Sequence, residues 1–124
     1  MLNTPFSPWP SFTQEEADAV SRTLLSNKVN YWTGSECREF EKEFAAYFGS
    51  EYAIALGNGT LALDVAFKAL NIGAGDEVVV TSRTFLASVS SIVLAGAVPV
   101  FADVDCDSQN IIAEPVKAVL TSRT

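Results

Sequence analysis

Apolar residues follow two different spacings along this chain, and the change falls near residue 52. Between residues 13 and 48 they recur every three to four positions, which predicts two amphipathic helices. The first begins after Thr13, which forms a T-x-x-E capping box with Glu16. From residue 52 onward, short apolar runs of strand length alternate with helical patterns. The predicted order in this half is strand, helix, strand, helix, strand, helix.

The predicted strands are residues 52–56, 77–81 and 98–104. Their alternation with helices predicts an α/β fold, in which a layered and mostly parallel sheet carries flanking helices and right-handed crossovers. Residues 1–51 are predicted to form an extended segment and helices, and residues 52–124 a partial α/β domain. Three strands would leave unprotected sheet edges, so this sheet is expected to be incomplete.

Aromatic side chains are concentrated in the first half of the chain. Residues 1–12 are rich in proline and are predicted to be extended, with their aromatic side chains packed on the domain or on a second subunit. Phe40, Phe44 and Phe48 are spaced four apart. This spacing places the three rings on one helix face and predicts that they belong to the core.

A glycine-containing turn, GNGT at residues 57–60, joins the first predicted strand to the next helix. The first turn of a helix has backbone N–H groups without partners, and the helix dipole makes it a suitable site for a phosphate. Thr60 adds a hydroxyl, while Gly57 and Gly59 permit positive φ and a close approach of an anion. Together with Ala62 the glycines also match the loose G-x-G-x-x-A pattern. A plain turn, a pyridoxal phosphate site and a nicotinamide dinucleotide site all remain open.

Two further segments carry aromatic residues next to predicted turns. Ligands of parallel sheets bind outside the carboxyl ends of the strands, so residues 57–60 and 82–85 are expected to face one crevice. There Phe85 is placed either to stack on a planar ring or to pack beneath its own helix. Tyr31 and Trp32 are neighbours in the loop before the second helix, and they form either a hydrophobic plug or one wall of a ligand cleft.

Composition excludes several classes of function. The 124 residues include 15 acidic and 8 basic residues, a net charge of −7, which argues against a nucleic-acid partner. There is no histidine, and Cys37 and Cys106 are far apart, so neither a metal site nor a histidine-dependent triad is expected. No signal-peptide pattern and no apolar run of about 20 residues is present. We therefore expect a cytoplasmic protein without a membrane partner.

The order and spacing of these segments resemble the N-terminal part of the DegT/StrS-type nucleotide-sugar aminotransferases. These are pyridoxal 5′-phosphate enzymes of fold type I. The resemblance is clearest in ALGNGTLALDVAFKALNIGAGDEVVVTSRTFLASVSSIVLAGAVPVFADVD. It continues upstream in YWTGSECREFEKEFAAYFG and extends roughly from Pro5 to Thr124.

The resemblance implies that the cofactor is pyridoxal 5′-phosphate. Gly59 and Thr60 would bind its phosphate, Asn58 would occupy a position that is often serine in the family, and Phe85 would stack on its ring.

The resemblance also implies a substrate and partners. Tyr31, Trp32 and Thr33 would border the cleft for a nucleotide sugar. In the complete enzyme an amino donor such as glutamate would take part, and two subunits would pair around each active site as a homodimer.

The chain also departs from the family pattern. The lysine that forms a Schiff base with the cofactor, and the aspartate that pairs with its ring nitrogen, come from later segments in this family. None of the chain's lysines aligns with that position: Lys28, Lys42, Lys68 and Lys117. We therefore assign no catalytic residue and expect an N-terminal fragment, truncated before the Schiff-base lysine and inactive alone.

Two alternatives remain open. One is a catalytically silent binding or dimerisation module derived from the same fold. The other is a dinucleotide-binding oxidoreductase domain, although Thr81, Ser82 and Arg83 stand where that class places an acidic residue.

Overall fold

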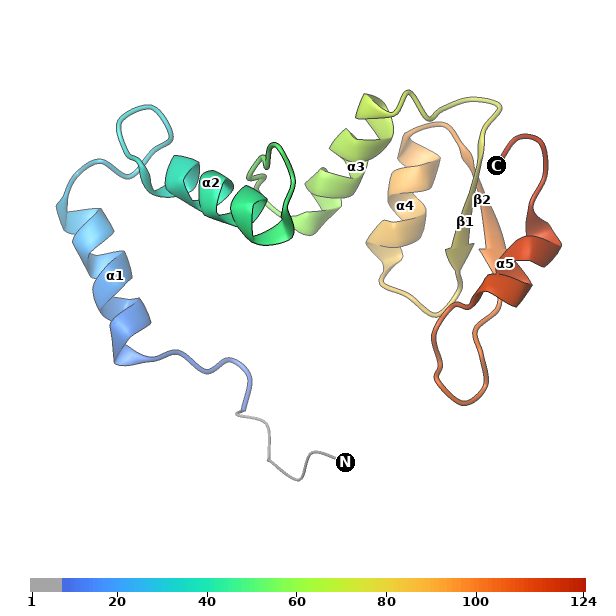
Figure 1. Cartoon of the computed structure of the whole chain (residues 1–124), viewed down its shortest axis with the longest axis horizontal. Coiled ribbons are helices and arrows are strands. Elements are labelled where there is room, and N and C mark those ends of the chain that lie inside the picture. The colour runs from blue at the N-terminus through green and yellow to red at the C-terminus, as the bar shows by residue number, and fades with distance from the viewer. Residues whose placement is uncertain (1–7) are drawn as a thin grey trace. The chain divides into compact units, whose positions relative to one another are not determined.

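A computed structural model describes residues 8–124 (Figure 1). Its contacts divide the chain into two compact units, Met1–Ala55 and Leu56–Thr124. The two domains expected from the sequence, with their boundary at residues 51 and 52, stay a prediction. The first part of the predicted extended segment, residues 1–7, lies outside the described residues.

The first unit contains α1 (Gln14–Leu25) and α2 (Glu36–Phe48). The predicted capping box is present: Glu16 N–H donates to Thr13 Oγ1 at 3.3 Å, and Thr13 N–H donates to the Glu16 carboxylate at 2.6 Å. The hydrogen bond from the Thr13 N–H lowers the pKa of Glu16. At the other end, α2 closes on Gly49 with a φ of 66°, a conformation that glycine adopts without a Cβ penalty.

The phenylalanine stripe of α2 is exposed, so the prediction that it belongs to the core is wrong for this structure. The Phe40 and Phe44 ring centroids are 5.5 Å apart, and those of Phe44 and Phe48 are 4.6 Å apart. All three rings are exposed, and among the described residues of α2 only Ala45 is buried. Helical spacing aligns side chains on one face, but burial also needs a facing surface. Here the rings contact one another instead.

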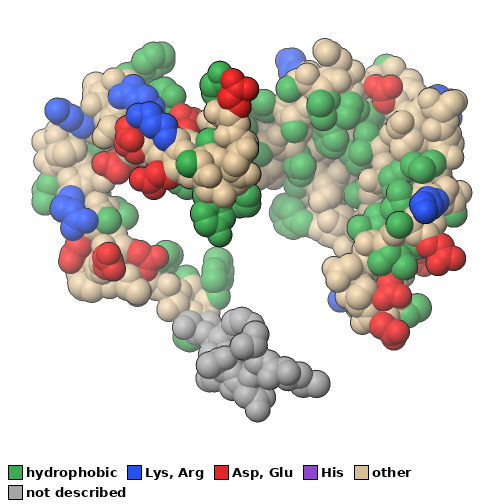
Figure 2. All heavy atoms as spheres, in the orientation of Figure 1, with side chains coloured by type: hydrophobic (Ala, Val, Ile, Leu, Met, Phe, Trp, Pro, Cys, Tyr) green, Lys and Arg blue, Asp and Glu red, His purple; other side chains and the backbone are tan. Residues whose placement is uncertain are grey.

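Among the described residues, the aromatic side chains of the predicted extended segment are not buried either. Trp9 and Phe12 are both exposed. Figure 2 shows many hydrophobic side chains on the surface. An exposed apolar surface of this extent is typical of a chain that has an interaction partner.

The second unit is an α/β unit with a parallel sheet, as the sequence predicts. Its elements are α3 (Gly59–Ala69), β1 (Glu77–Thr81), α4 (Leu86–Leu94), β2 (Val98–Ala102) and α5 (Ala113–Val119). Among the described residues β1 and β2 form a two-stranded sheet, in register from the pair Glu77 and Val98 to the pair Thr81 and Ala102. The core lies where α4 crosses this sheet, around Ile92.

Two strand predictions need correction. Residues 52–56 are not a strand, because a strand exists only through its ladder and this segment has no ladder partner among the described residues. Instead the Ala55 N–H donates to Glu41 Oε1 at 2.8 Å. The last strand ends at Ala102 rather than at residue 104, and Val104 forms only an isolated antiparallel bridge with Ile111.

The residues after α5 are fixed to the beginning of β1. Glu77 is only 8% exposed, and its carboxylate accepts hydrogen bonds from the Thr121 hydroxyl and the Arg123 guanidinium. The Glu77 N–H also donates to the Arg123 carbonyl at 2.9 Å. The hydrogen bond from Thr121 and the contact with Arg123 together lower the pKa of Glu77.

This contact makes the stability of the second unit depend on pH. Because the pKa of Glu77 is lower in the folded chain, its contribution is present above the unfolded pKa and is lost as pH falls through the folded pKa. We expect the melting temperature of the chain to fall between about pH 5 and pH 3, and Glu77→Gln to reduce both the melting temperature at pH 7 and its acid dependence. Circular dichroism melts across this range measure both effects. Glu114→Gln, at an exposed carboxylate, should behave like the unmodified chain.

Candidate functional site

The first turn of α3 presents unpaired backbone donors. Asn58 caps the helix: its Oδ1 accepts from the Leu61 N–H at 3.0 Å, and its carbonyl accepts from the Ala62 N–H at 3.1 Å. The N–H groups of Gly59 and Thr60 therefore have no partner within the described chain. The helix dipole places about half a positive charge at this end. The turn can accept an anion such as a phosphate, with the Thr60 hydroxyl as a further donor.

The glycines of this turn do not adopt an unusual backbone conformation, and Gly59 leaves open space beside the backbone. Neither Gly57 nor Gly59 has a positive φ, which corrects the expectation for both. A Cβ added at Gly59 would meet no heavy atom within 4 Å. The space in front of the Gly59 backbone is open, so an anion can approach it closely.

Phe85 lies at the start of α4, with its ring free. It is the N-cap residue of this helix, and it is 77% exposed. The interpretation that it packs beneath its own helix is therefore wrong. Its ring is available to lie against a planar group.

Both helix starts lie at the same end of the second unit. Figure 1 shows α3 and α4 side by side, with their first turns toward the carboxyl end of β1. The same alignment follows from one cavity between them, to which Asp64 and Lys68 contribute from α3, and Ser91 and Leu94 from α4. The structure thus places residues 58–60 and Phe85 at the same end of the second unit.

This cavity has a volume of about 370 Å³ and contains polar atoms that the sequence did not predict. Ser91 is fully buried, and neither its Oγ nor Asp64 Oδ1 has a hydrogen-bond partner among the described residues. A polar cavity of this size has room for ordered water, which satisfies such groups in folded proteins. Neither residue could be singled out from the sequence, because both lie in helices whose packing decides their surroundings.

The loop that contains Tyr31, Trp32 and Thr33 is held by side-chain contacts of the first unit. The Asn30 Oδ1 accepts from the backbone N–H groups of Trp32 and Thr33, each at 3.0 Å. Trp32 is 87% exposed, so its interpretation as a hydrophobic plug is wrong. The loop presents this indole to the surroundings.

Glu41 joins this loop to residue 55. Its Oε2 accepts from the Tyr31 hydroxyl at 3.1 Å, and its Oε1 accepts from the Ala55 N–H. The hydrogen bond to Glu41 raises the pKa of Tyr31. The Arg38 guanidinium lies 5.4 Å from the centroid of the Tyr31 ring, within the range of a cation–π contact. Sequence reasoning missed Glu41, because it stands in an acidic helix with nothing to distinguish it from its neighbours.

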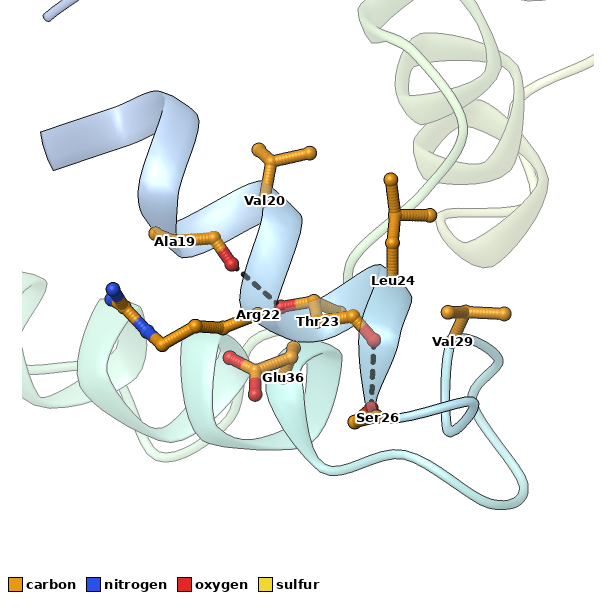
Figure 3. Close-up of a pocket in the computed structure, with 8 residues that line it drawn as sticks. All are labelled: Ala19, Val20, Arg22, Thr23, Leu24, Ser26, Val29 and Glu36. Carbon is orange, nitrogen blue, oxygen red and sulfur yellow. Dashed lines mark hydrogen bonds between the residues drawn. The ribbon is translucent and has the colours of Figure 1, made fainter. Parts of the chain in front are cut away.

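A separate hollow of about 530 Å³ lies at the end of α1 (Figure 3). No predicted site residue lines it. Val20, Leu24 and Val29 give it an apolar wall, while the hydroxyls of Thr23 and Ser26 donate to backbone carbonyls of α1. Those hydroxyls are already paired, so this hollow is a weaker candidate for chemistry than the end of the sheet.

Two further observations concern the described part of the chain as a whole. Residues 8–124 contain no group of three or more side chains arranged to hold a metal ion. None of the five helices described has the length and apolarity that crossing a membrane requires.

The chain matches the sequence profile of the DegT/DnrJ/EryC1/StrS aminotransferase family over residues 10–124. Over 115 residues it is 41% identical to the spore coat polysaccharide biosynthesis protein SpsC of Bacillus subtilis, covering 93% of this chain and 29% of SpsC. It is 38% identical over 119 residues to the 3-amino-5-hydroxybenzoate synthase of Amycolatopsis mediterranei.

A solved structure of the aminotransferase from Psychrobacter cryohalolentis superposes with a TM-score of 0.90 and 71% identity. The match covers 97% of this chain and 30% of that one. This chain thus spans about 30% of the length of the relatives it matches. With residues 10–124 matched by the profile, it belongs to the DegT/DnrJ/EryC1/StrS aminotransferase family.

Proposed function

We propose that this chain supplies the phosphate-binding part of a pyridoxal 5′-phosphate-dependent aminotransferase that acts on a nucleotide-linked keto sugar. The observation that carries the proposal is the first turn of α3, where the N–H groups of Gly59 and Thr60 are unpaired beside open space. Family membership supports the cofactor, since a sugar aminotransferase homologue from Streptococcus pneumoniae, 33% identical, is known in PLP and PMP forms. The SpsC relationship supports a role in polysaccharide biosynthesis.

Each residue of this turn has its own task in the proposal. Asn58 caps α3 by accepting from the Leu61 N–H, so the N–H groups of Gly59 and Thr60 stay free for the cofactor phosphate. Thr60 adds a hydroxyl donor. Phe85 covers one face of the cofactor ring and fixes its plane. When bound, pyridoxal phosphate supplies the electron-withdrawing ring that makes amino-group transfer possible.

The substrate side of the proposal uses the loop of the first unit. Tyr31, Trp32 and Thr33 border the sugar-nucleotide cleft, and an amino donor such as glutamate supplies the nitrogen. Hydrogen bonds to Asn30 fix this loop, and the exposed indole suits stacking on a nucleobase. The nucleotide sugar is proposed from the resemblance and from the polysaccharide role in the name of SpsC, whereas the related 3-amino-5-hydroxybenzoate synthase is named for an aromatic product.

The complete enzyme in this proposal is a cytoplasmic homodimer, and the isolated chain is inactive. Transamination needs a lysine at the cofactor as covalent anchor and proton carrier. Lys68 stands eight residues beyond Thr60 on α3, roughly 12 Å along the helix axis. Lys117 lies in α5, and neither Lys28 nor Lys42 belongs to the second unit. None of these residues is assigned the role.

A matched pair of substitutions at Asn58 tests the phosphate site. The host is a chimera in which this chain replaces the matching part of the Psychrobacter cryohalolentis aminotransferase. Serine and aspartate are both good N-caps, so Asn58→Ser and Asn58→Asp keep α3 equally well capped. Only aspartate places a negative charge beside the phosphate, and we expect it to weaken pyridoxal phosphate binding about tenfold or more. Asn58→Ser should bind within about threefold of the unmodified chimera. Equal cofactor affinity in the two variants would contradict the assignment.

The isolated chain gives a second test. Pyridoxal phosphate added to these 124 residues should produce no absorption band of lysine-bound cofactor and no amino transfer. A band that disappears on replacing one of the four lysines with arginine would show that the chain carries its own anchor and would refute its inactivity.

A catalytically silent binding or dimerisation module remains a second candidate, and the exposed phenylalanine stripe of α2 favours it. The chimera separates the two, because a silent module would not restore amino transfer. The dinucleotide-binding oxidoreductase has no comparable support: β1 is followed by Ser82 and Arg83, and the chain belongs to an aminotransferase family.

A further inference from the structure

One carboxylate of α2 binds two segments of the first unit that are well separated in the sequence. Glu41 Oε2 accepts from the Tyr31 hydroxyl at 3.1 Å, and Glu41 Oε1 accepts from the Ala55 N–H at 2.8 Å. Tyr31 lies 10 positions before Glu41, and Ala55 lies 14 positions after it. Each carboxylate oxygen has its own donor, so the two contacts form together without competing.

Tyr31 is held at its ring as well as at its hydroxyl. The Arg38 guanidinium lies 5.4 Å from the centroid of this ring and also donates to the Gly34 carbonyl at 2.6 Å. The Trp32 ring meets the Tyr31 ring edge-on, with the two centroids 6.4 Å apart. Because the Tyr31 hydroxyl proton is donated to Glu41, Tyr31 serves as the frame of the loop, and the exposed Trp32 is available to a substrate.

The hydrogen bond at Ala55 fixes the backbone just before the proposed phosphate turn. Residues 52–56 have no ladder partner among the described residues, and the Ala55 N–H donates to a side chain instead. Glu41 is half-buried, so this bond is partly shielded from water and is stronger for it. Ala55 stands three positions before Asn58, the cap of α3. An anchored backbone at Ala55 leaves less conformational entropy to be lost when the turn binds a ligand.

We infer that Glu41 is a positioning residue of the proposed aminotransferase. Its one carboxylate holds both the loop assigned to the sugar nucleotide and the backbone that leads into the phosphate turn. The inference rests on the proposed function for its effect on activity, and on the two hydrogen bonds for its effect on structure. Glu41 acts through Tyr31 and Ala55 rather than on the reacting atoms. Its loss should therefore weaken the binding of both ligands and leave kcat unchanged.

A matched pair of substitutions at Glu41 tests this role in the chimera. Glu41→Gln keeps both contacts, because its amide oxygen accepts from the Ala55 N–H while its NH₂ group donates to the Tyr31 oxygen. Glu41→Met keeps the length of the side chain and the helix propensity, but it removes both contacts. Glu43→Met is the control, at an exposed carboxylate of the same helix.

The three variants should separate in their binding constants. For Glu41→Met we expect KM for the nucleotide sugar to rise at least about fivefold, and pyridoxal phosphate affinity to fall at least about threefold. Its kcat with both ligands saturating should stay within about twofold of the unmodified chimera. Glu41→Gln and Glu43→Met should stay within about twofold in all three quantities.

Hydrogen exchange at the Ala55 amide of the full chain gives a readout that needs no activity. Glu41→Met should accelerate this exchange at least about tenfold, because the amide loses its acceptor. Glu41→Gln should keep it within about threefold of the unmodified chain. Tyr31→Phe removes only the hydroxyl, so it should raise KM for the nucleotide sugar at least about threefold and leave cofactor affinity within about twofold.

The outcomes distinguish the inference from the proposed function. A glutamine variant as impaired as the methionine variant, or a methionine variant that loses only one of the two ligands, would overturn the inference. If Glu41→Met does not fold, Tyr31→Phe decides, and an unchanged KM in that variant would contradict the role of Glu41. If the unmodified chimera transfers no amino group, the proposed function fails, and the exchange of Ala55 still tests whether Glu41 holds this backbone.

Discussion

Replacing Ile92 with alanine should lower the free energy of unfolding of the second unit by about 2–5 kcal/mol. Ile92 is 1% exposed and lies in α4 against Val80 and Ala97, with Phe67 packed on the same cluster. The substitution removes buried methyl groups and leaves a cavity that so small a core cannot refill. For a unit of this size the loss is a large share of the total stability. Urea unfolding of the full chain, followed by circular dichroism, measures it.

Val93→Ala is the matched control, because Val93 follows Ile92 in the same helix but is exposed. We expect its effect to stay below about 0.5 kcal/mol, since surface substitutions change stability little and alanine is the better helix former. Equal losses in the two variants would mean that α4 does not pack on the sheet in solution. A loss at Ile92 alone places the core where the structure has it.

The local elements of this fold could be predicted from the sequence because short-range chemistry determines them. The capping box at Thr13 fixes the start of α1, and Gly49 ends α2 through its positive φ. The run of valines in β1 gave the bounds of that strand correctly. Each of these features depends on neighbours within about four residues.

Predictions that depended on an absent partner failed. Residues 52–56 have the composition of a strand, but no ladder partner for them exists among the described residues. Phe40, Phe44 and Phe48 have the spacing of a core face, but in this structure no packing surface buries them. A pattern shows what a segment can do, whereas pairing and burial are decided by a second segment.

The candidate site shows the same division. The prediction placed residues 58–60 and Phe85 together because the carboxyl ends of parallel strands share an edge, but only Phe85 follows a strand. Residues 58–60 lie at the same end of the second unit because α3 packs beside α4. The contact of Glu77 with Thr121 and Arg123 could not be predicted. Thr121 lies 44 positions and Arg123 lies 46 positions from Glu77 in the sequence. Glu41 likewise acts on Tyr31 and Ala55, which are 10 and 14 positions away. Such contacts arise only when the fold is in place.

Replacing Gly34 with alanine should disrupt the loop that presents Tyr31, Trp32 and Thr33. A Cβ at this position would lie 2.3 Å from the Lys28 carbonyl oxygen and 2.9 Å from that of Asn30. Both are backbone atoms, so the clash cannot be relieved by rotating a side chain. Overpacking of this kind costs about 1–3 kcal/mol. The Gly34 N–H would then lose its 2.8 Å hydrogen bond to the Asn30 carbonyl.

Hydrogen exchange at the Trp32 and Thr33 amides, which donate to Asn30 Oδ1, measures this opening. Gly57→Ala is the control, because a Cβ there meets only Leu61 Cδ1 at 3.5 Å and the φ of Gly57 is not positive. Slow exchange at both amides in Gly34→Ala would show that the loop does not need this glycine. In the chimera, the proposed role of the loop in substrate binding predicts that Gly34→Ala raises KM for the sugar nucleotide and leaves the affinity for pyridoxal phosphate unchanged. The donors proposed for the cofactor phosphate belong to α3, which the clash at Gly34 does not touch.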